Sequence, residues 1–135
     1  MSKRILISLC LSIILLMGVY GKTIPRVEHG VLDLRQAGFD GKALYNLNGE
    51  WEFYWDSFVA YAEFQSDSLF EPDSYAEIPG YWNSYKLPGE SITNTGYASY
   101  RLKILLPRNF SDTLGFLVPV FDVAYNMQIN GRSVA

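Results

Sequence analysis

Aromatic rings and polar side chains lie close together in the second half of the chain. The group consists of Tyr81, Trp82, Asn83, Tyr85, Tyr97 and Arg101. A sugar presents flat C–H faces that stack on Trp or Tyr rings, while its hydroxyls need amide, carboxylate or guanidinium partners. This combination predicts a ligand-binding platform for a carbohydrate or a small metabolite. The alternative is structural: Trp82 closes one end of the fold and the tyrosines cover its rim.

Two carboxylates stand at a spacing that is used in glycoside hydrolysis. Glu50 and Glu52 are two residues apart in a predicted strand, and the strand rise places them about 7 Å from each other. Inverting glycosidases, however, hold the sugar between carboxylates that approach it from opposite sides, and alternate side chains of one strand lean the same way. We therefore interpret the pair as a solvated strand face and predict no catalytic residue.

Other reactive side chains are sparse. His29 is the single histidine, so a Ser-His-Asp arrangement would have to use it; its place beside Gly30 at the start of a strand predicts a surface residue. With Cys10 as the single cysteine, no transition-metal site and no cofactor are expected. A calcium site built from carboxylates stays open, with three candidates: Asp33, Asp40 and Asp112.

The elements that must position these residues are organised around the segment Leu47–Asp56. Trp51, Phe53 and Trp55 alternate there with Glu50, Glu52 and Tyr54, which predicts a half-buried β-strand with an aromatic face. Asn48 and Gly49 before it favour a turn. We expect the aromatic face to form the floor of a β-sandwich core.

The rest of the chain predicts further short strands and one helix. The expected strands are His29–Leu34, Tyr75–Ile78 before a Pro79–Gly80 turn, Gly96–Pro107, Leu114–Val118 and Val123–Ile129. Mixed spacings of aromatic residues predict a short helix near Ser57–Gln65, and Lys86–Thr95 reads as a long polar loop. Asn130–Gly131 is a strong hairpin signal.

The N-terminus has the features of a secretory signal peptide. Lys3 and Arg4 precede an apolar run over Ile5–Val19, and cleavage is expected after Gly21. An uncleaved anchor is the alternative, although the run is shorter than the ~20 residues of a membrane-spanning helix. Cys10 lies between two leucines, so we interpret it as an apolar filler rather than a lipid attachment site.

The predicted domain organisation follows from this cleavage. Residues 1–21 are the signal peptide, 22–30 a polar lead-in, and 31–135 one β-sandwich. Removing residues 1–21 leaves 9 of the 11 basic side chains against 14 acidic ones, a mildly acidic balance that argues against nucleic acid as a partner. The protein is expected outside the cytoplasm, on the periplasmic or extracellular face.

The hairpin signal at Asn130–Gly131 leaves only four residues for the returning strand. A strand over Val123–Ile129 would then lack most of its expected partner and expose backbone hydrogen-bonding groups. We therefore expect the sandwich to lack its last strands and the chain to be either the N-terminal part of a longer protein or the product of a truncated gene.

Four motifs in order resemble a known module: "LNGEWEFYWD", "EIPGYWN", "GYASYRLKILLP" and "VAYNMQINGRSVA". Together they resemble the galactose-binding-like jelly roll, including the sugar-binding domain at the front of family 2 glycoside hydrolases. With "GVLDLR" they are most similar to the extracytoplasmic N-terminal domain of bacterial receptors that have seven transmembrane helices and diverse intracellular signalling modules. The resemblance implies packing roles for Trp51, Gly80, Trp82, Tyr100, Asn130 and Gly131 and no ligand contact.

The resemblance implies a non-catalytic sensory domain that passes a signal to a downstream transmembrane domain. Our leading hypothesis is therefore an extracytoplasmic ligand-binding module of a bacterial membrane receptor. Two alternatives remain open: an accessory sugar-binding domain of a secreted glycoside hydrolase, and a structural domain that docks another protein through exposed aromatic side chains.

Overall fold

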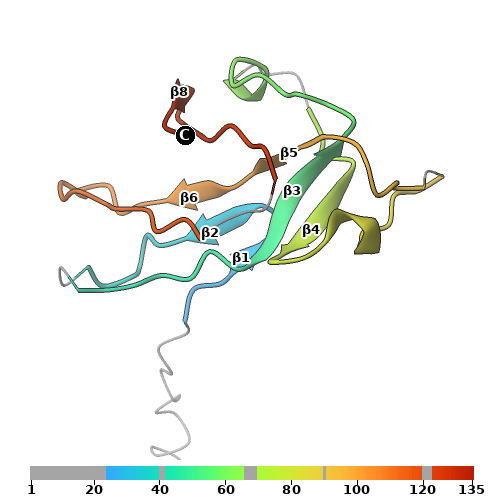
Figure 1. The fold of residues 1–135 in the computed structure, drawn as a ribbon. Coiled ribbons are helices and arrows are strands. Elements are labelled where there is room, and N and C mark those ends of the chain that lie inside the picture. The colour runs from blue at the N-terminus through green and yellow to red at the C-terminus, as the bar shows by residue number, and fades with distance from the viewer. Residues whose placement is uncertain (1–23, 40–41, 66–69, 90, 120–122) are drawn as a thin grey trace, which may run out of the picture.

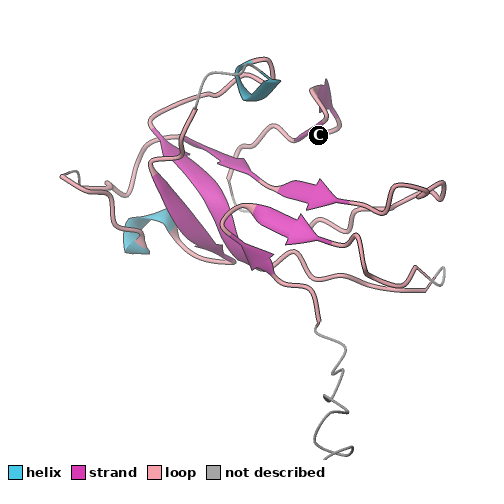
Figure 2. Ribbon diagram, turned by 180° about the vertical axis from the view of Figure 1, so that it is seen from behind, coloured by secondary structure: helices cyan, strands magenta, loops and turns pink. Residues whose placement is uncertain are grey.

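The computed structural model describes residues 24–39, 42–65, 70–89, 91–119 and 123–135. The predicted signal peptide lies outside these residues. The described elements are β1 (Val27–Glu28), β2 (Val31–Asp33), β3 (Gly49–Trp55), the 3-10 helix η1 (Glu63–Gln65), β4 (Ser74–Ile78), the 3-10 helix η2 (Trp82–Ser84), β5 (Ala98–Arg101), β6 (Lys103–Leu105), β7 (Gln128–Ile129) and β8 (Arg132–Ser133). Strands dominate and both helices are single turns (Figure 2), so the all-β class is confirmed.

Six strands form one sheet and two form a separate hairpin (Figure 1). The sheet has the order β4-β3-β1-β2-β6, and β5 also pairs with β3. β4 and β5 run antiparallel to β3, whereas β1 is parallel to β3 and β2 is parallel to β6. β3 is therefore the strand on which the sheet is built, as the sequence predicted for this segment.

The register of β3 assigns side chains to two faces. Directly opposed residues share a face, and β3 places Phe53 opposite Tyr100 and Glu52 opposite Arg101. We call the side that carries Trp51, Phe53, Trp55 and Tyr100 the apolar face. We call the other side, which carries Glu50, Glu52, Tyr54 and Arg101, the polar face. The alternation predicted for β3 is confirmed.

The hydrophobic core lies on the apolar face. Val27, Leu32 and Leu34 are buried there, and Phe53 is fully buried further along β3. Partly buried side chains pack against the first three: Ala37, Phe39, Tyr45, Leu47, Trp51, Leu102, Ile104 and Leu106. Trp51 is fixed by its indole N–H, which donates to Leu47 O at 2.7 Å. The burial of this face is the main apolar contribution to stability.

The polar face is covered around Glu52 and Tyr54, which corrects the prediction of a solvated strand face. Tyr54 is 2% exposed and Glu52 is 7% exposed, because the rings of Phe64 and Phe70 cover Tyr54 at centroid distances of 5.6 and 5.2 Å. Glu50, nearer the start of the strand, keeps a half-exposed side chain. The aromatic face of β3 is thus only one of two packed surfaces.

The segment 22–30, expected as a lead-in, contributes a strand and a core residue. β1 pairs with β2 as an antiparallel hairpin, and His29 and Gly30 form its turn with φ angles of 47° and 74°. Two positive φ angles in a two-residue turn match the twist of a tight hairpin. His29 therefore belongs to a turn rather than to the strand we predicted, although it is exposed as expected.

Several predicted elements are shorter than expected or absent from the described residues. The helix expected over Ser57–Gln65 is reduced to η1, and the strand expected over Val123–Ile129 is reduced to β7. Leu114–Val118 forms no strand. The strand over Gly96–Pro107 is divided into β5 and β6, which pair with different neighbours.

The C-terminal hairpin is confirmed where the sequence predicted it. Asn130 and Gly131, with φ angles of 50° and 79°, connect β7 to β8. The hairpin lies beside the loop that carries η1 (Figure 1), and Gly131 packs against the ring of Tyr61. Among the described residues no helix has the length and apolar character to cross a membrane.

Candidate functional site

The structure divides the six predicted platform residues between the two faces of the sheet. Trp82 and Tyr85 contact the apolar face through Trp55 and Phe53. Arg101 lies on the polar face, opposite Glu52. A single platform that contains all six residues is therefore wrong, and each must be placed separately.

Trp82 and Trp55 lie at the centre of the part of the predicted platform that the structure does bring together. Their rings meet edge to face, with centroids 5.5 Å apart and an interplanar angle of 80°. Phe53 stacks on the other side of Trp55 at 6.1 Å. Gly96 approaches the edge of the Trp55 ring so closely that an added Cβ would lie 2.6 Å from it. The strand, helix η2 and the loop before β5 thus meet at Trp55.

Helix η2 sets the position of the neighbouring polar groups. Tyr81 O accepts hydrogen bonds from Ser84 N at 2.9 Å and from Ser84 Oγ at 2.6 Å, which holds the single turn in place. Asn83, on this turn, donates through Nδ2 to Asn94 Oδ1 at 3.3 Å. Tyr81 itself is 83% exposed. We call the group Trp55, Tyr81, Trp82, Asn83 and Asn94 the tryptophan corner.

Tyr85 points into the sheet rather than to a ligand. Its ring packs edge-on against Phe53 at 5.3 Å, and its hydroxyl donates to Glu77 O at 3.1 Å. Burial raises the pKa of the Tyr85 hydroxyl and also that of Tyr100, which hydrogen-bonds to Tyr85. Tyr85 is therefore a packing residue that anchors the chain after η2.

Tyr97 belongs to a different aromatic pair. Its ring stacks on Phe58 with a centroid distance of 4.4 Å and an angle of 13°. A hydrogen bond with Asp56 raises the pKa of the Tyr97 hydroxyl. Ser99 on β5 fixes the same segment, because Ser99 Oγ accepts from Val59 N at 3.0 Å and donates to Ser57 O at 2.8 Å. Tyr97 covers the polar face and does not join the tryptophan corner.

Arg101 is held by an acidic partner. Its Nη2 donates to Glu52 Oε1 at 2.9 Å, and its Nε lies 2.5 Å from Glu52 Oε2 at an angle that makes an ion pair rather than a hydrogen bond. Tyr54 donates to Glu52 Oε2 at 2.8 Å. The guanidinium lies 4.4 Å above the centre of the Phe64 ring, a favourable cation–π distance.

The cluster of Glu52, Tyr54, Arg101 and Phe64 was missed as a unit in the sequence. Burial, together with the hydrogen bond to Glu52, raises the pKa of the Tyr54 hydroxyl, as expected where a phenol meets a carboxylate in a poorly solvated place. One signal in the sequence could have revealed it. The two strongly alternating strands carry charges of opposite sign, Glu52 on one strand and Arg101 on the other, and Tyr54 shares the face of Glu52. Pairing those strands with Glu52 opposite Arg101 would have predicted the ion pair.

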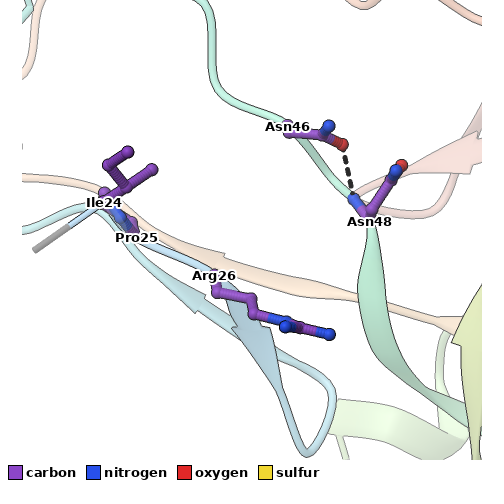
Figure 3. A pocket seen from close by; sticks show the side chains of 5 residues that line it. All are labelled: Ile24, Pro25, Arg26, Asn46 and Asn48. Carbon is purple, nitrogen blue, oxygen red and sulfur yellow. Dashed lines mark hydrogen bonds between the residues drawn. The ribbon is translucent and has the colours of Figure 1, made fainter.

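Two hollows of the described surface lie away from the tryptophan corner. One of about 300 Å³ is lined by Ile24, Pro25, Arg26, Asn46 and Asn48 (Figure 3), and an adjoining one of about 310 Å³ shares the first three of these residues. Arg26 is already paired with Glu77 at 3.0 Å, and Asn46 Oδ1 accepts from Asn48 N at 2.8 Å. Arg26 and Asn46 thus already have partners within the protein, and we assign no ligand to this region.

The candidate calcium ligands do not form a cluster among the described residues. Arg35 donates hydrogen bonds from Nε and Nη2 to the Asp33 carboxylate, and this contact lowers the pKa of the Asp33 carboxyl to about 2. Asp112 is exposed, and Asp40 lies outside the described residues. No group of three or more metal-ligating acidic, His or Cys side chains is present in the described part of the chain.

His29 has acidic and aromatic neighbours. Its backbone N–H donates to Glu50 Oε2 at 3.2 Å, and its ring meets Tyr75 edge-on at 5.0 Å. These contacts stabilise the β1–β2 turn on β3 and β4. They do not build the arrangement of nucleophile and base that acyl transfer needs.

No protein-family model, no curated protein and no solved structure matches this chain. The class that the fold defines is an all-β protein built on one mixed sheet.

Proposed function

We propose that the chain is a non-catalytic ligand-binding domain that takes a carbohydrate or small metabolite at the tryptophan corner. The observation that carries this proposal is the edge-to-face pair of Trp55 and Trp82 beside the hydrogen-bonded amides of Asn83 and Asn94. Apolar rings next to amide donors and acceptors are the combination that sugar C–H faces and hydroxyls require.

The exposure of Tyr81 supports the same site. A tyrosine that is 83% exposed at the start of η2 gains nothing from the core, yet its backbone is fixed by Ser84. Because the backbone of Tyr81 is already fixed, only its side-chain rotamers have to be ordered when the ring covers a ligand. Tyr81 would then form the outer wall of a site whose floor is Trp55, with Trp82 beside it.

We further propose that the domain is exported and acts as the sensory part of a bacterial membrane receptor. The support is the basic and apolar N-terminal segment and the order of the four motifs given above. The finer fold that we propose is a galactose-binding-like jelly roll. The apolar face of the sheet supports it, because such a face needs a covering layer.

Binding is tested with the purified chain by intrinsic tryptophan fluorescence and by melting temperature against a panel of sugars and small metabolites. A ligand of the tryptophan corner shifts the emission and raises the melting temperature. Trp82→Ala abolishes the binding, whereas Tyr75→Ala, which removes an exposed tyrosine from the polar face, keeps it. Failure of every compound to produce either signal would overturn the proposal.

Export is tested by fusing alkaline phosphatase after Ala135 and expressing the fusion in a bacterium. The reporter needs disulfides that form only outside the cytoplasm, so activity is expected from the intact chain. A fusion that lacks residues 1–21 is the matched control and should be inactive. Equal activity of the two fusions would contradict export.

A second candidate function, protein docking, is favoured by a separate observation. Large apolar side chains are exposed after β6: Leu114, Phe116, Leu117, Val118 and Val123. Contiguous exposed apolar surface is typical of an interface. Substituting Leu117, which is 97% exposed, by Asp would leave ligand binding at the tryptophan corner intact if the two functions are separate.

A further inference from the structure

The charge around the tryptophan corner decides which ligands it can accept. In the sequence, Arg101 was the cation expected beside the rings. The structure instead holds Arg101 on the polar face, with Nη2 2.9 Å from Glu52 Oε1 and its guanidinium over Phe64. A carboxylate on a ligand at the apolar face therefore cannot use this guanidinium.

The side chain that is charged and directly tied to the corner is acidic. Asp73 Oδ2 accepts a hydrogen bond from Trp55 N at 2.9 Å. This bond is made to the backbone of Trp55, so the carboxylate lies at the end of β3 next to the residue whose ring belongs to the corner. A negative charge there repels an anionic ligand, and like charges brought together at a binding surface are a common source of selectivity.

The remaining polar groups of the corner are neutral amides. Asn83 Nδ2 donates to Asn94 Oδ1 at 3.3 Å. This bond does not use the carbonyl oxygen of Asn83, an acceptor, or the amino group of Asn94, a donor, and both residues are exposed. A pair of neighbouring sugar hydroxyls offers the complementary donor and acceptor. The nearest cation in the sequence, Lys86, is exposed, and its backbone carbonyl is turned to Ser74 Oγ.

We propose that the tryptophan corner selects uncharged sugars over acidic ones, and that Asp73 enforces this selection. The inference rests on the proposed ligand-binding function and names the substrate class of the same site. Trp55 and Trp82 offer rings on which any pyranose can stack. The charge of the ligand therefore determines whether the site prefers uncharged or acidic sugars.

The test compares sugars that differ only at one carbon. The purified chain is titrated with short oligomers of galactose and of glucose and with the matching oligomers of galacturonic and glucuronic acid, and binding is followed by tryptophan fluorescence. The neutral oligomer of at least one pair should bind about tenfold more tightly than its acidic counterpart at low ionic strength. Asn83→Ala should weaken the neutral oligomer.

Two variants link the selectivity to Asp73. Asp73→Asn keeps a carbonyl acceptor for Trp55 N, so the strand end is preserved while the charge is removed; it should improve binding of the acidic oligomer severalfold and leave the neutral one unchanged. Lys86→Gln is the control and should not alter the preference.

The outcomes separate the two proposals. If acidic oligomers bind as well as or better than neutral ones, the selectivity is overturned while the ligand-binding function stands. If neither class binds but another metabolite binds at Trp82, the inference falls and the function stands. If nothing binds, both fall.

Discussion

The carboxylate of Glu52 and the guanidinium of Arg101 face each other across the β3–β5 pair, 49 residues apart in the sequence, with a hydrogen bond of 2.9 Å and an ion-pair contact of 2.5 Å. Their side chains are 10% and 24% exposed. The pair is therefore poorly screened by solvent, and it joins the strand at the centre of the sheet to a strand that arrives late in the chain.

Breaking this pair should destabilise the fold. Arg101→Met leaves the Glu52 carboxylate buried with Tyr54 as its remaining partner, and we expect a loss of about 2 kcal/mol in the free energy of unfolding, because an unpaired buried charge is costly. Urea denaturation followed by circular dichroism measures it. Glu77→Gln, which breaks the exposed pair of Glu77 with Arg26, is the control, with an expected effect below about 1 kcal/mol.

Replacing both members distinguishes a buried charge from a lost contact. If the cost of Arg101→Met arises from the stranded Glu52 carboxylate, the double variant Glu52→Gln with Arg101→Met should be more stable than Arg101→Met alone. Equal stabilities of the two variants, or an effect of Arg101→Met no larger than that of Glu77→Gln, would contradict this account.

Gly30 should tolerate no side chain. Its φ is +74°, and an added Cβ would lie 2.5 Å from Glu52 Cγ. Gly30→Ala therefore combines backbone strain of about 1–2 kcal/mol with displacement of the Glu52 carboxylate. We expect it to be among the most destabilising glycine substitutions in urea unfolding.

Two other glycines separate the effect of backbone strain from the effect of the contact with Glu52. Gly89 has a φ of +82° but nothing within 4 Å of an added Cβ, and Gly115 has open space and no positive φ. The loss should therefore fall in the order Gly30→Ala, Gly89→Ala, Gly115→Ala, with the last close to zero. A Gly30→Ala loss equal to that of Gly89→Ala would show that the contact with Glu52 is unimportant.

Tyrosine ionisation should limit stability at alkaline pH. Burial raises the pKa of Tyr100 and of Tyr54 above the ordinary tyrosine value of about 10. Above pH 10 each therefore stays protonated in the folded protein while it ionises in the unfolded chain. Their stabilising contribution is complete below pH 10 and is lost as the pH rises through the folded pKa. The contribution of these two tyrosines to the free energy of unfolding should therefore be constant below pH 10 and decrease above pH 10.

Tyr100→Phe tests the assignment. Phenylalanine cannot ionise, so the decline in the free energy of unfolding above pH 10 should be shallower in this variant. Tyr81→Phe, at a residue that is 83% exposed, is the control and should follow the unsubstituted protein. Identical alkaline profiles for Tyr100→Phe and the unsubstituted protein would refute the raised pKa.

The local features of the fold were predictable from the sequence. The alternation around Trp51, Phe53 and Trp55 gave the central strand and its faces, because successive side chains of a strand point to opposite sides whatever surrounds them. Asn130–Gly131 gave the C-terminal turn, because these residues accept positive φ. The all-β class follows from such short-range preferences.

The candidate site was predictable only in part. Trp82 and Asn83 do lie at an aromatic corner, but its floor is Trp55, which the sequence assigned to the core. Tyr85 and Tyr97 were grouped with them by proximity in the sequence, and hydroxyl contacts in the structure turn them to other partners. Spacing along a loop does not define which face of a sheet each side chain reaches.

The residue pattern was enough to predict the direction in which strand side chains point, whereas the segments that cover those side chains became known only from the folded chain. The sequence pattern predicted the correct face of β3 for Glu52. It predicted solvent exposure wrongly, because the burial of Glu52 depends on Phe64 and Arg101, which come from other segments of the chain. Leu114–Val118 has the composition of a strand but no partner in the described sheet, and a strand needs a neighbour to pair its backbone groups. Burial and pairing are non-local, and only the folded chain settles them.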